Sequence, residues 1–426
     1  MQPSPAPPRD PFAWCAGSAI AFLLLACIRL RVPDAPYFDE LHYVPAAREL
    51  LMLGEFTNRE HPLLGKIILA GSMALFGDNP LGWRLPAALG GGVALFASMR
   101  ALWFATFSRS ATLIYGLLLG TGGLLFVHSR IAMLEIFMLA FLALAFWQAA
   151  AAMREPETGR RRLIVVGIAL GAAMGAKWNA VAIAPVFGLA FLAMRARSGR
   201  RRLWWSRRGA PLPGMTLFEA TGWLGMVPLA IYAATFMPAY FFDSGAIGSP
   251  SGSGGLIAHH VRMFELQSGL KAPHHYQSAW WQWAANTRGI WYLYEPIGGV
   301  WRGILLIGNP VSMLVGLIAV AWCAARCWTD AVAGSFAGLY ALTLGFWILA
   351  AKPVQFYYHY LLPSMFLLAS LALMLDAMWR RGWRFGVAAV LIGTFVAFAW
   401  LYPIQSAAPL EGERAFERWM LLPGWR

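Results

Sequence analysis

The chain has 426 residues, of which 59% are hydrophobic and only 13% are charged, and its mean hydropathy is +0.56. Since a soluble domain carries about 25% charged residues, this composition excludes an ordinary soluble protein and indicates an integral membrane protein. The net charge of +14 does not indicate nucleic-acid binding, because the arginines fall in short segments between apolar runs, as expected for cytoplasmic loops.

A membrane-spanning helix needs about 20 apolar residues, and the chain holds about eleven such runs. The sequence therefore predicts an all-α multi-span bundle, with no internal repeat and no separate soluble domain. The predicted spans are residues 12–31, 80–103, 111–128, 131–152, 163–178, 180–194, 216–237, 303–324, 331–350, 358–378 and 385–403.

The distribution of arginine predicts the orientation of these spans. Arginines concentrate in alternate connections, including the run from Arg195 to Arg208, and such connections face the cytoplasm. The opposite side then receives a first external loop at 32–79, a long external loop at 238–302 that includes a Gly/Ser-rich stretch at 245–255, and a C-terminal tail at 404–426. All eight histidines fall on that side or at its boundary, so we expect the chemistry there.

The first external loop has the strongest local signal. Asp39 and Glu40 are adjacent carboxylates that lie shortly after the first span, and such groups are costly beside a membrane unless they face water or perform chemistry. The same loop predicts two short interfacial helices, at 40–53 and 63–76. We interpret it as the rim of an active site, the alternative being a solvated loop.

Several segments resemble, in order, the protein O-mannosyltransferase family. The resemblance implies a GT-C fold and a polyprenyl-phosphate-linked sugar donor. The chain departs from the family pattern at two positions: Glu135 stands where the family usually has Asp, and Leu63 replaces a Pro. The segments that carry the resemblance are Phe38–Tyr43, Glu60–Lys66, His128–Ile131 with Leu134–Glu135, Gly175–Trp178, Ser278–Trp283, Gly308–Pro310 and Tyr358–Pro363.

Glycosyl transfer to a hydroxyl group needs a base for the acceptor proton and cations for the leaving phosphate. The resemblance implies that Asp39 is the general base, and we expect Glu40 to orient the acceptor or neighbouring groups. Lys66 and Arg130 are the predicted phosphate contacts. The alternatives are that Lys66 anchors its helix and that Arg130 only reaches toward the membrane surface.

Further candidates lie at the outer boundary of later spans. Lys177 and Lys352 are weaker predicted phosphate contacts. His61 and His359 are expected either to bind sugar or phosphate or to be structural. Glu135 lies near the start of its span, and a buried carboxylate there needs a cationic partner, which Arg130 or a cation of an outer loop could supply.

The sequence leaves the acceptor open. The resemblance favours transfer of mannose to Ser or Thr of an exported protein at the periplasmic face of a bacterial inner membrane, and a lipid or envelope glycan is the alternative acceptor. A transporter is disfavoured, because the charged residues crowd one face and no repeat is visible. No cofactor is indicated. A divalent metal stays open, although the pairs His259-His260 and His274-His275 match no standard zinc spacing.

Overall fold

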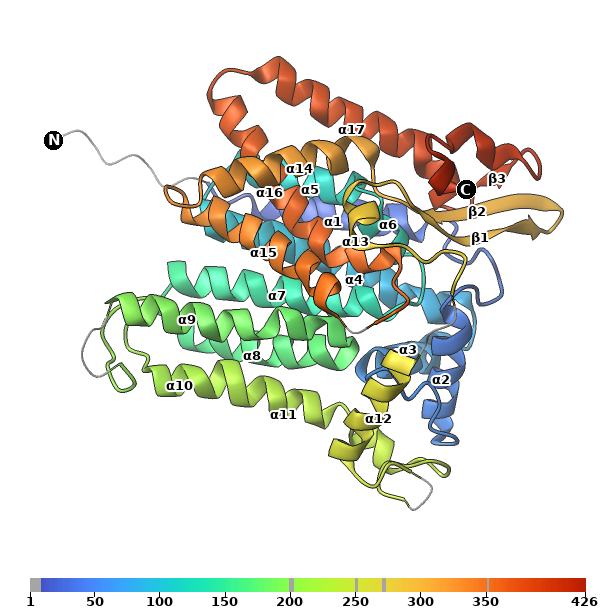
Figure 1. The fold of residues 1–426 in the computed structure, drawn as a ribbon, viewed down its shortest axis with the longest axis horizontal. Coiled ribbons are helices and arrows are strands. Elements are labelled where there is room, and N and C mark those ends of the chain that lie inside the picture. The colour runs from blue at the N-terminus through green and yellow to red at the C-terminus, as the bar shows by residue number, and fades with distance from the viewer. Residues whose placement is uncertain (1–8, 199–202, 250–251, 270–272, 351) are drawn as a thin grey trace.

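The computed structural model describes residues 9–198, 203–249, 252–269, 273–350 and 352–426. Parts of the predicted arginine run at 195–208 and of the Gly/Ser-rich stretch at 245–255 lie outside the described residues. The long helices run side by side along the long axis of the molecule (Figure 1). Within the described residues, seven helical segments are long and apolar enough to cross a membrane: Pro80–Thr106 (α4), Leu134–Arg154 (α7), Trp178–Ser198 (η1 and α9, Ala184–Ser198), Leu217–Ala234 (α10, η2 and α11), Ala331–Leu349 (α15), Tyr357–Arg380 (η4 and α16, Leu361–Arg380) and Arg384–Gln405 (α17).

Each of these seven segments coincides with a predicted span, but the count of eleven complete spans is not confirmed. The helix predicted at 111–128 is broken at Gly123, whose φ of 87° is in the left-handed region. The helices at the four other predicted positions are α1 (Phe12–Cys27), α5 (Arg109–Thr121) with α6 (Leu124–His128), α8 (Gly159–Ala176) and α14 (Pro310–Ala325).

The start of the span predicted at 303–324 is wrong, because that segment begins as a β-strand. Strands β1 (Ile290–Ile297) and β2 (Val300–Leu306) form an antiparallel hairpin, and β3 (Pro409–Leu410) pairs with β2. The hairpin turns at Gly298-Gly299, both with positive φ, a dipeptide that favours tight turns between strands. The molecule is therefore mostly helical with one small sheet.

The two predicted external loops and the C-terminal tail gather at one end of the bundle, which we call the loop end (Figure 1). The two short helices predicted in the first loop are present as α2 (Glu40–Met52) and α3 (Leu64–Phe76). They lie there with α12 (Leu256–Gly269), α13 (Trp280–Ala284), the β-hairpin and the C-terminus. Segments far apart in the sequence are thus brought together over the helix ends.

Close packing fixes α8, which carries Lys177 at its end. A Cβ at Gly167 would lie 2.1 Å from the carbonyl oxygen of Trp223, and one at Gly171 would lie 2.5 Å from that of Pro228. Small residues four apart let two helix backbones approach closely in a membrane. The contact holds α8 against α10–α11 and so sets the position at which Lys177 leaves the helix.

A buried ion pair attaches the first loop to the bundle. Arg84 of α4 donates from Nε and Nη2 to the two carboxylate oxygens of Glu40, at 2.9 and 2.8 Å, and both side chains are fully buried. Arg84 also donates to the carbonyl oxygens of Leu30, Pro33 and Ala35. These bonds therefore fix the chain on both sides of Asp39.

We predict that Glu40→Ala strongly destabilises the protein, because it leaves the Arg84 charge buried without its partner. Breaking one side of a buried pair costs about 3–5 kcal/mol. Thermal unfolding in detergent, followed by tryptophan fluorescence, measures the change. The matched control is Glu265→Ala, which removes an exposed carboxylate 3.1 Å from Arg262 and should change stability by about 0–1 kcal/mol. Equal shifts for the two variants would contradict this account.

Candidate active site

Asp39 lies at the start of α2, where its side chain is half-buried. Phe38 before it adopts a left-handed φ of 52°, and Tyr43, one turn later, donates from its hydroxyl to Asp39 Oδ2 at 3.4 Å. Burial raises the pKa of Asp39 to about 6, with Lys177 opposing the rise and Glu135 adding to it. The carboxylate is therefore more basic than an ordinary aspartate and still ionised at neutral pH.

Lys177 connects Asp39 to Glu135. It follows α8 in extended conformation, and its ammonium group donates to Glu135 Oε1 at 2.5 Å and to the Tyr43 hydroxyl at 3.3 Å. Because an ammonium group only donates, the Tyr43 hydroxyl accepts a hydrogen bond from Lys177 and donates its own to Asp39. Ammonium, phenol and carboxylate thus form an ordered chain. The cationic partner that Glu135 needs is Lys177 and not Arg130.

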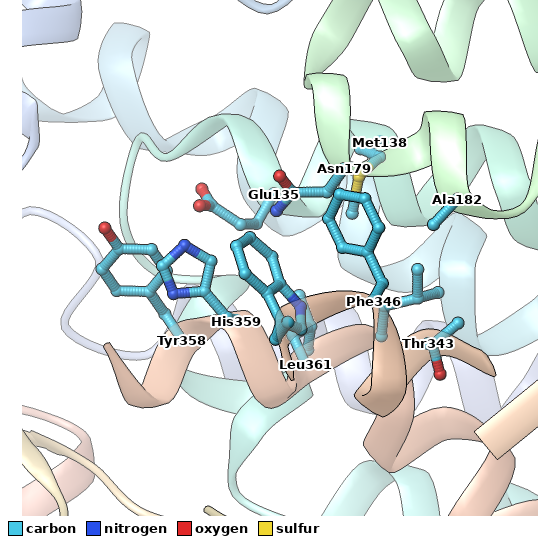
Figure 2. Close-up of a pocket in the computed structure, with 11 residues that line it drawn as sticks. Glu135, Met138, Asn179, Ala182, Thr343, Phe346, Tyr358, His359 and Leu361 are labelled. Carbon is cyan, nitrogen blue, oxygen red and sulfur yellow. The ribbon is translucent and has the colours of Figure 1, made fainter. Parts of the chain in front are cut away.

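Figure 2 shows a small pocket beside these hydrogen-bonded groups. Glu135 and Asn179 line it on one side, and Tyr358 and His359 line it on the other. The second carboxylate oxygen of Glu135 and the Nε2 of His359 are buried and have no hydrogen-bond partner among the described residues. Buried polar atoms are normally paired, so a ligand or water is needed to satisfy these two.

Lys352 is a further cation near Lys177, Glu135 and Asp39. Its side chain is half-buried, and within the described part of the chain its ammonium group makes no hydrogen bond or ion pair. Burial, reinforced by the positive charge of Lys177, lowers its pKa to about 8, and Glu135 and Asp39 oppose this change. An unpaired cation close to two carboxylates can bind an anion such as a phosphate group.

His61 lies at the edge of the same cluster. Its ring packs edge to face on Tyr43, with centroids 5.6 Å apart, and its Nδ1 lies 3.3 Å from the side-chain nitrogen of Gln267 on α12. Burial lowers the pKa of His61 well below its ordinary value, and Lys177 and Lys352 add to the effect. His61 is therefore held neutral beside Asp39.

Lys66, one of the two predicted phosphate contacts, is buried and occupied by its own loop. Its ammonium group donates to the carbonyl oxygens of Asn58, at 2.6 Å, and His61, at 3.1 Å. Burial lowers its pKa to about 7. These bonds make Lys66 the residue that closes the Asn58–His61 turn, and they give its predicted phosphate contact no support.

Arg130, the other predicted phosphate contact, uses two of its three guanidinium nitrogens to bind the backbone, and its Nε has no partner among the described residues. Its guanidinium donates to the carbonyl oxygens of Ala26, Ile28 and Ser406, at 2.5–3.1 Å, and it lies over the ring of Phe126. It therefore ties the ends of α1 and α17 together. These bonds give Arg130 a structural role, and its phosphate contact stays a prediction.

Glu40 does not share the surroundings of its neighbour Asp39. Besides Arg84, its oxygens accept from the backbone nitrogens of Ala132, at 2.9 Å, and Tyr37, at 3.3 Å. All of its contacts are with the protein scaffold, so Glu40 can orient Asp39 but has no free oxygen to orient an acceptor. This corrects the part of the prediction that concerned the acceptor.

Sequence reasoning missed the tyrosines of the cluster. Tyr43 had a usable signal, because a residue four after Asp39 on a helix faces it. Tyr358 belonged to a recognised motif but received no role. Tyr292 lies in β1, and its position depends on a hairpin that was not predicted. Among the described residues, no group of three or more His, Cys, Asp or Glu is placed to hold a metal.

Comparisons with known proteins agree along most of the chain. Residues 81–240 match the family "Dolichyl-phosphate-mannose-protein mannosyltransferase", and residues 254–425 match the "C-terminal four TMM region of protein-O-mannosyltransferase". The chain is similar to a polyprenol-phosphate-mannose–protein mannosyltransferase of Corynebacterium glutamicum, with 26% identity covering 89% of this chain and 86% of that protein. The protein of the same name from Mycobacterium tuberculosis is 25% identical, covering 92% and 87% of the two chains.

Solved structures agree with this fold. The S. cerevisiae protein O-mannosyltransferase Pmt1-Pmt2 complex bound to the sugar donor superposes with a TM-score of 0.78 at 13% identity, covering 98% of this chain and 93% of that one. ArnT from Cupriavidus metallidurans bound to undecaprenyl phosphate gives 0.59 at 16% identity, covering 91% and 64%. With both halves of the chain matched to one family, this multi-span membrane protein belongs to the protein O-mannosyltransferases and is a glycosyltransferase of the GT-C fold.

Proposed function

We propose that the protein transfers mannose from a polyprenyl-phosphate-mannose donor to a Ser or Thr hydroxyl of an exported protein. The observation that carries the proposal is the hydrogen-bonded series from Lys177 through Tyr43 to Asp39, together with the nearby ammonium group of Lys352, which has no partner among the described residues. This arrangement offers a base and a free cation within one buried cluster. The names of the relatives, which are protein mannosyltransferases that use such a donor, support both substrates.

In the proposed reaction Asp39 accepts the proton of the acceptor hydroxyl, and the oxygen of that hydroxyl attacks the anomeric carbon of the sugar. The bond between that carbon and the phosphate oxygen breaks, and polyprenyl phosphate leaves with the electron pair. Lys352 compensates the charge that develops on the phosphate. Lys177 forms an ion pair with Glu135 and, through Tyr43, holds Asp39 in place. The proton on Asp39 is then released to solvent at the loop end.

We also propose that the loop end faces the periplasm of a bacterial inner membrane. The support is the concentration of arginine in the connections at the opposite end of the bundle, which is typical of cytoplasmic loops. The first external loop, the long external loop and the C-terminal tail then form the outer face of a single membrane-embedded domain. Exported proteins and the headgroup of a lipid-linked donor would both reach the site from this side.

The direct test is transfer of labelled mannose from polyprenyl-phosphate-mannose to a Ser/Thr-containing peptide by the purified protein. We expect a mannosylated peptide in mass spectrometry. The parallel reaction offers a lipid extract in place of the peptide. Labelling of the lipid extract alone would contradict a protein acceptor, and labelling of neither would contradict the proposed reaction.

We predict that Asp39→Asn lowers the rate of transfer by about 10²–10⁴-fold, the usual effect of losing a general base, while donor binding stays close to that of the wild type. Initial rates with peptide acceptor and donor binding to purified protein measure the two effects. Asp330→Asn is the matched control, because it makes the same chemical change at a residue that caps α15 through its side-chain oxygen, which an asparagine retains. A wild-type rate for Asp39→Asn would remove the assignment of the base.

The pH dependence of kcat/KM should be bell-shaped. A base with a raised pKa is lost as the pH falls, so the rate should decline below about 6, and a required cation with a lowered pKa is lost as the pH rises, so it should decline above about 8. Lys352→Arg keeps its charge at high pH and should remove the alkaline decline only. An alkaline decline that persists in Lys352→Arg would show that another group causes it.

Lys66→Met and Lys352→Met should have opposite effects. Lys66→Met leaves two loop carbonyl groups without their donor, each at about 1–3 kcal/mol, so it should lower thermal stability. Lys352→Met removes no described contact, so it should keep wild-type stability and weaken binding of polyprenyl phosphate. Thermal unfolding and lipid binding in detergent measure both. A stable Lys66→Met protein with weakened lipid binding would restore Lys66 as the phosphate contact.

Cysteine labelling in intact cells tests the orientation. In a background without native cysteines, a membrane-impermeant reagent should label Glu411→Cys in the C-terminal tail and should not label Arg160→Cys in the opposite connection. Both side chains are exposed or close to the surface of the protein, so access depends on the membrane alone. Labelling of position 160 from outside, with protection of position 411, would reverse the proposed topology.

A further inference from the structure

Two aromatic side chains beside the candidate active site have buried polar atoms that none of the described residues satisfies. His128 ends α6 and is fully buried, and Tyr292 lies in β1 with 4% of its surface exposed. Their rings meet edge to face, with centroids 6.4 Å apart. The Nε2 of His128 and the hydroxyl of Tyr292 have no hydrogen-bond partner within the described residues. Such atoms are normally satisfied by water or ligand.

The hydrogen bond on the other ring nitrogen determines what His128 can bind. Its Nδ1 lies 2.8 Å from the carbonyl oxygen of Leu124. Because a carbonyl oxygen only accepts, Nδ1 must carry a proton, and in the neutral ring Nε2 is then an acceptor. The partner of Nε2 must therefore be a donor. A hydroxyl group meets this requirement, whereas an ionised phosphate oxygen has no proton to donate.

A β-bulge places Tyr292 next to this acceptor. The pairing of β1 with β2 shifts between Trp291 and Leu293, so Tyr292 is the extra residue of the strand, and bulges redirect side chains in this way. The phenol ring stacks on Phe38, with centroids 4.2 Å apart at 29°. Phe38 directly precedes Asp39, and the Tyr292 hydroxyl lies near enough to Glu135 and Asp39 to interact with their charges.

We propose that His128 and Tyr292 together bind one hydroxyl group of the donor's sugar, which donates to Nε2 of His128 and accepts from the Tyr292 hydroxyl. This inference rests on the proposed function. It names the residues that bind the sugar of the donor rather than its phosphate or lipid. The hydroxyl bound here keeps its proton, unlike the acceptor hydroxyl, which loses its proton to Asp39. The pair therefore determines specificity and is separate from the phosphate contact at Lys352.

The test compares binding of polyprenyl-phosphate-mannose and of bare polyprenyl phosphate to the purified full-length protein. Tyr292→Phe removes only the hydroxyl, and it should weaken binding of the mannosyl lipid about tenfold, as expected for one lost hydrogen bond, without changing binding of the bare lipid. His128→Phe retains an aromatic ring and should reduce the same preference. Tyr294→Phe is the matched control, because it removes a hydroxyl of the same strand that instead donates to the carbonyl oxygen of Gly412.

A wild-type preference for the mannosyl lipid in both Tyr292→Phe and His128→Phe would overturn the inference. The same conclusion follows if the preference is kept while KM for the acceptor peptide rises, because the bound hydroxyl then belongs to the acceptor. The fate of the proposed function is read separately. Loss of the sugar preference in the variants, with no transfer to peptide by the wild type, would uphold the pair and contradict the protein acceptor.

Discussion

The position of the proposed base depends on the buried ion pair between Glu40 and Arg84. The segment before α2 has little secondary structure of its own, and Arg84 binds three of its carbonyl groups together with the Glu40 carboxylate. Glu40 in turn accepts from the backbone of Ala132, at the start of the loop that leads into α7. One arginine of a membrane-embedded helix thus fixes the first loop relative to the helix that carries Glu135. The two adjacent carboxylates consequently have different roles. Glu40 is held in an ion pair with Arg84, and Asp39 is left half-buried with a raised pKa.

The charges around Asp39 fall into two kinds. Lys66, Arg130 and Arg84 are buried cations that donate to carbonyl groups or to Glu40, and they hold the loops in place. Within the described residues, the Nε of Arg130 is left without a partner. Lys352 has no such use among the described residues, and Lys177 is shared between Glu135 and Tyr43. A ligand anion is stabilised by a cation that does not first have to break strong internal bonds, because only then is the whole interaction gained on binding. For this reason the structure favours Lys352 as the phosphate contact over the two residues that the sequence favoured.

The sequence predicted the fold class, the two short helices of the first loop and the gathering of Asp39, Glu135, Lys177 and His359, because apolar run length and arginine asymmetry are strong signals in a membrane protein. It did not predict the β-hairpin, since an apolar run ahead of a helix cannot be told from the start of that helix by hydropathy alone, although Gly298-Gly299 was a usable turn signal. The roles of Lys66 and Arg130 were missed for a different reason. A cation in the right loop is visible in the sequence, but whether its donors are already occupied depends on backbone carbonyl groups that only the folded chain brings near. Tyr292 combines both difficulties, because its place depends on a bulge in the hairpin.

A structure of the protein in complex with a polyprenyl-phosphate-linked sugar would test this account most directly. The account predicts that the lipid phosphate forms an ion pair with the ammonium group of Lys352, that the anomeric carbon faces the Asp39 carboxylate, and that Lys66 and Arg130 keep their bonds to backbone carbonyl groups. A phosphate bound to Lys66 or Arg130, with Lys352 directed away from it, would contradict the proposed division between structural and ligand-binding cations.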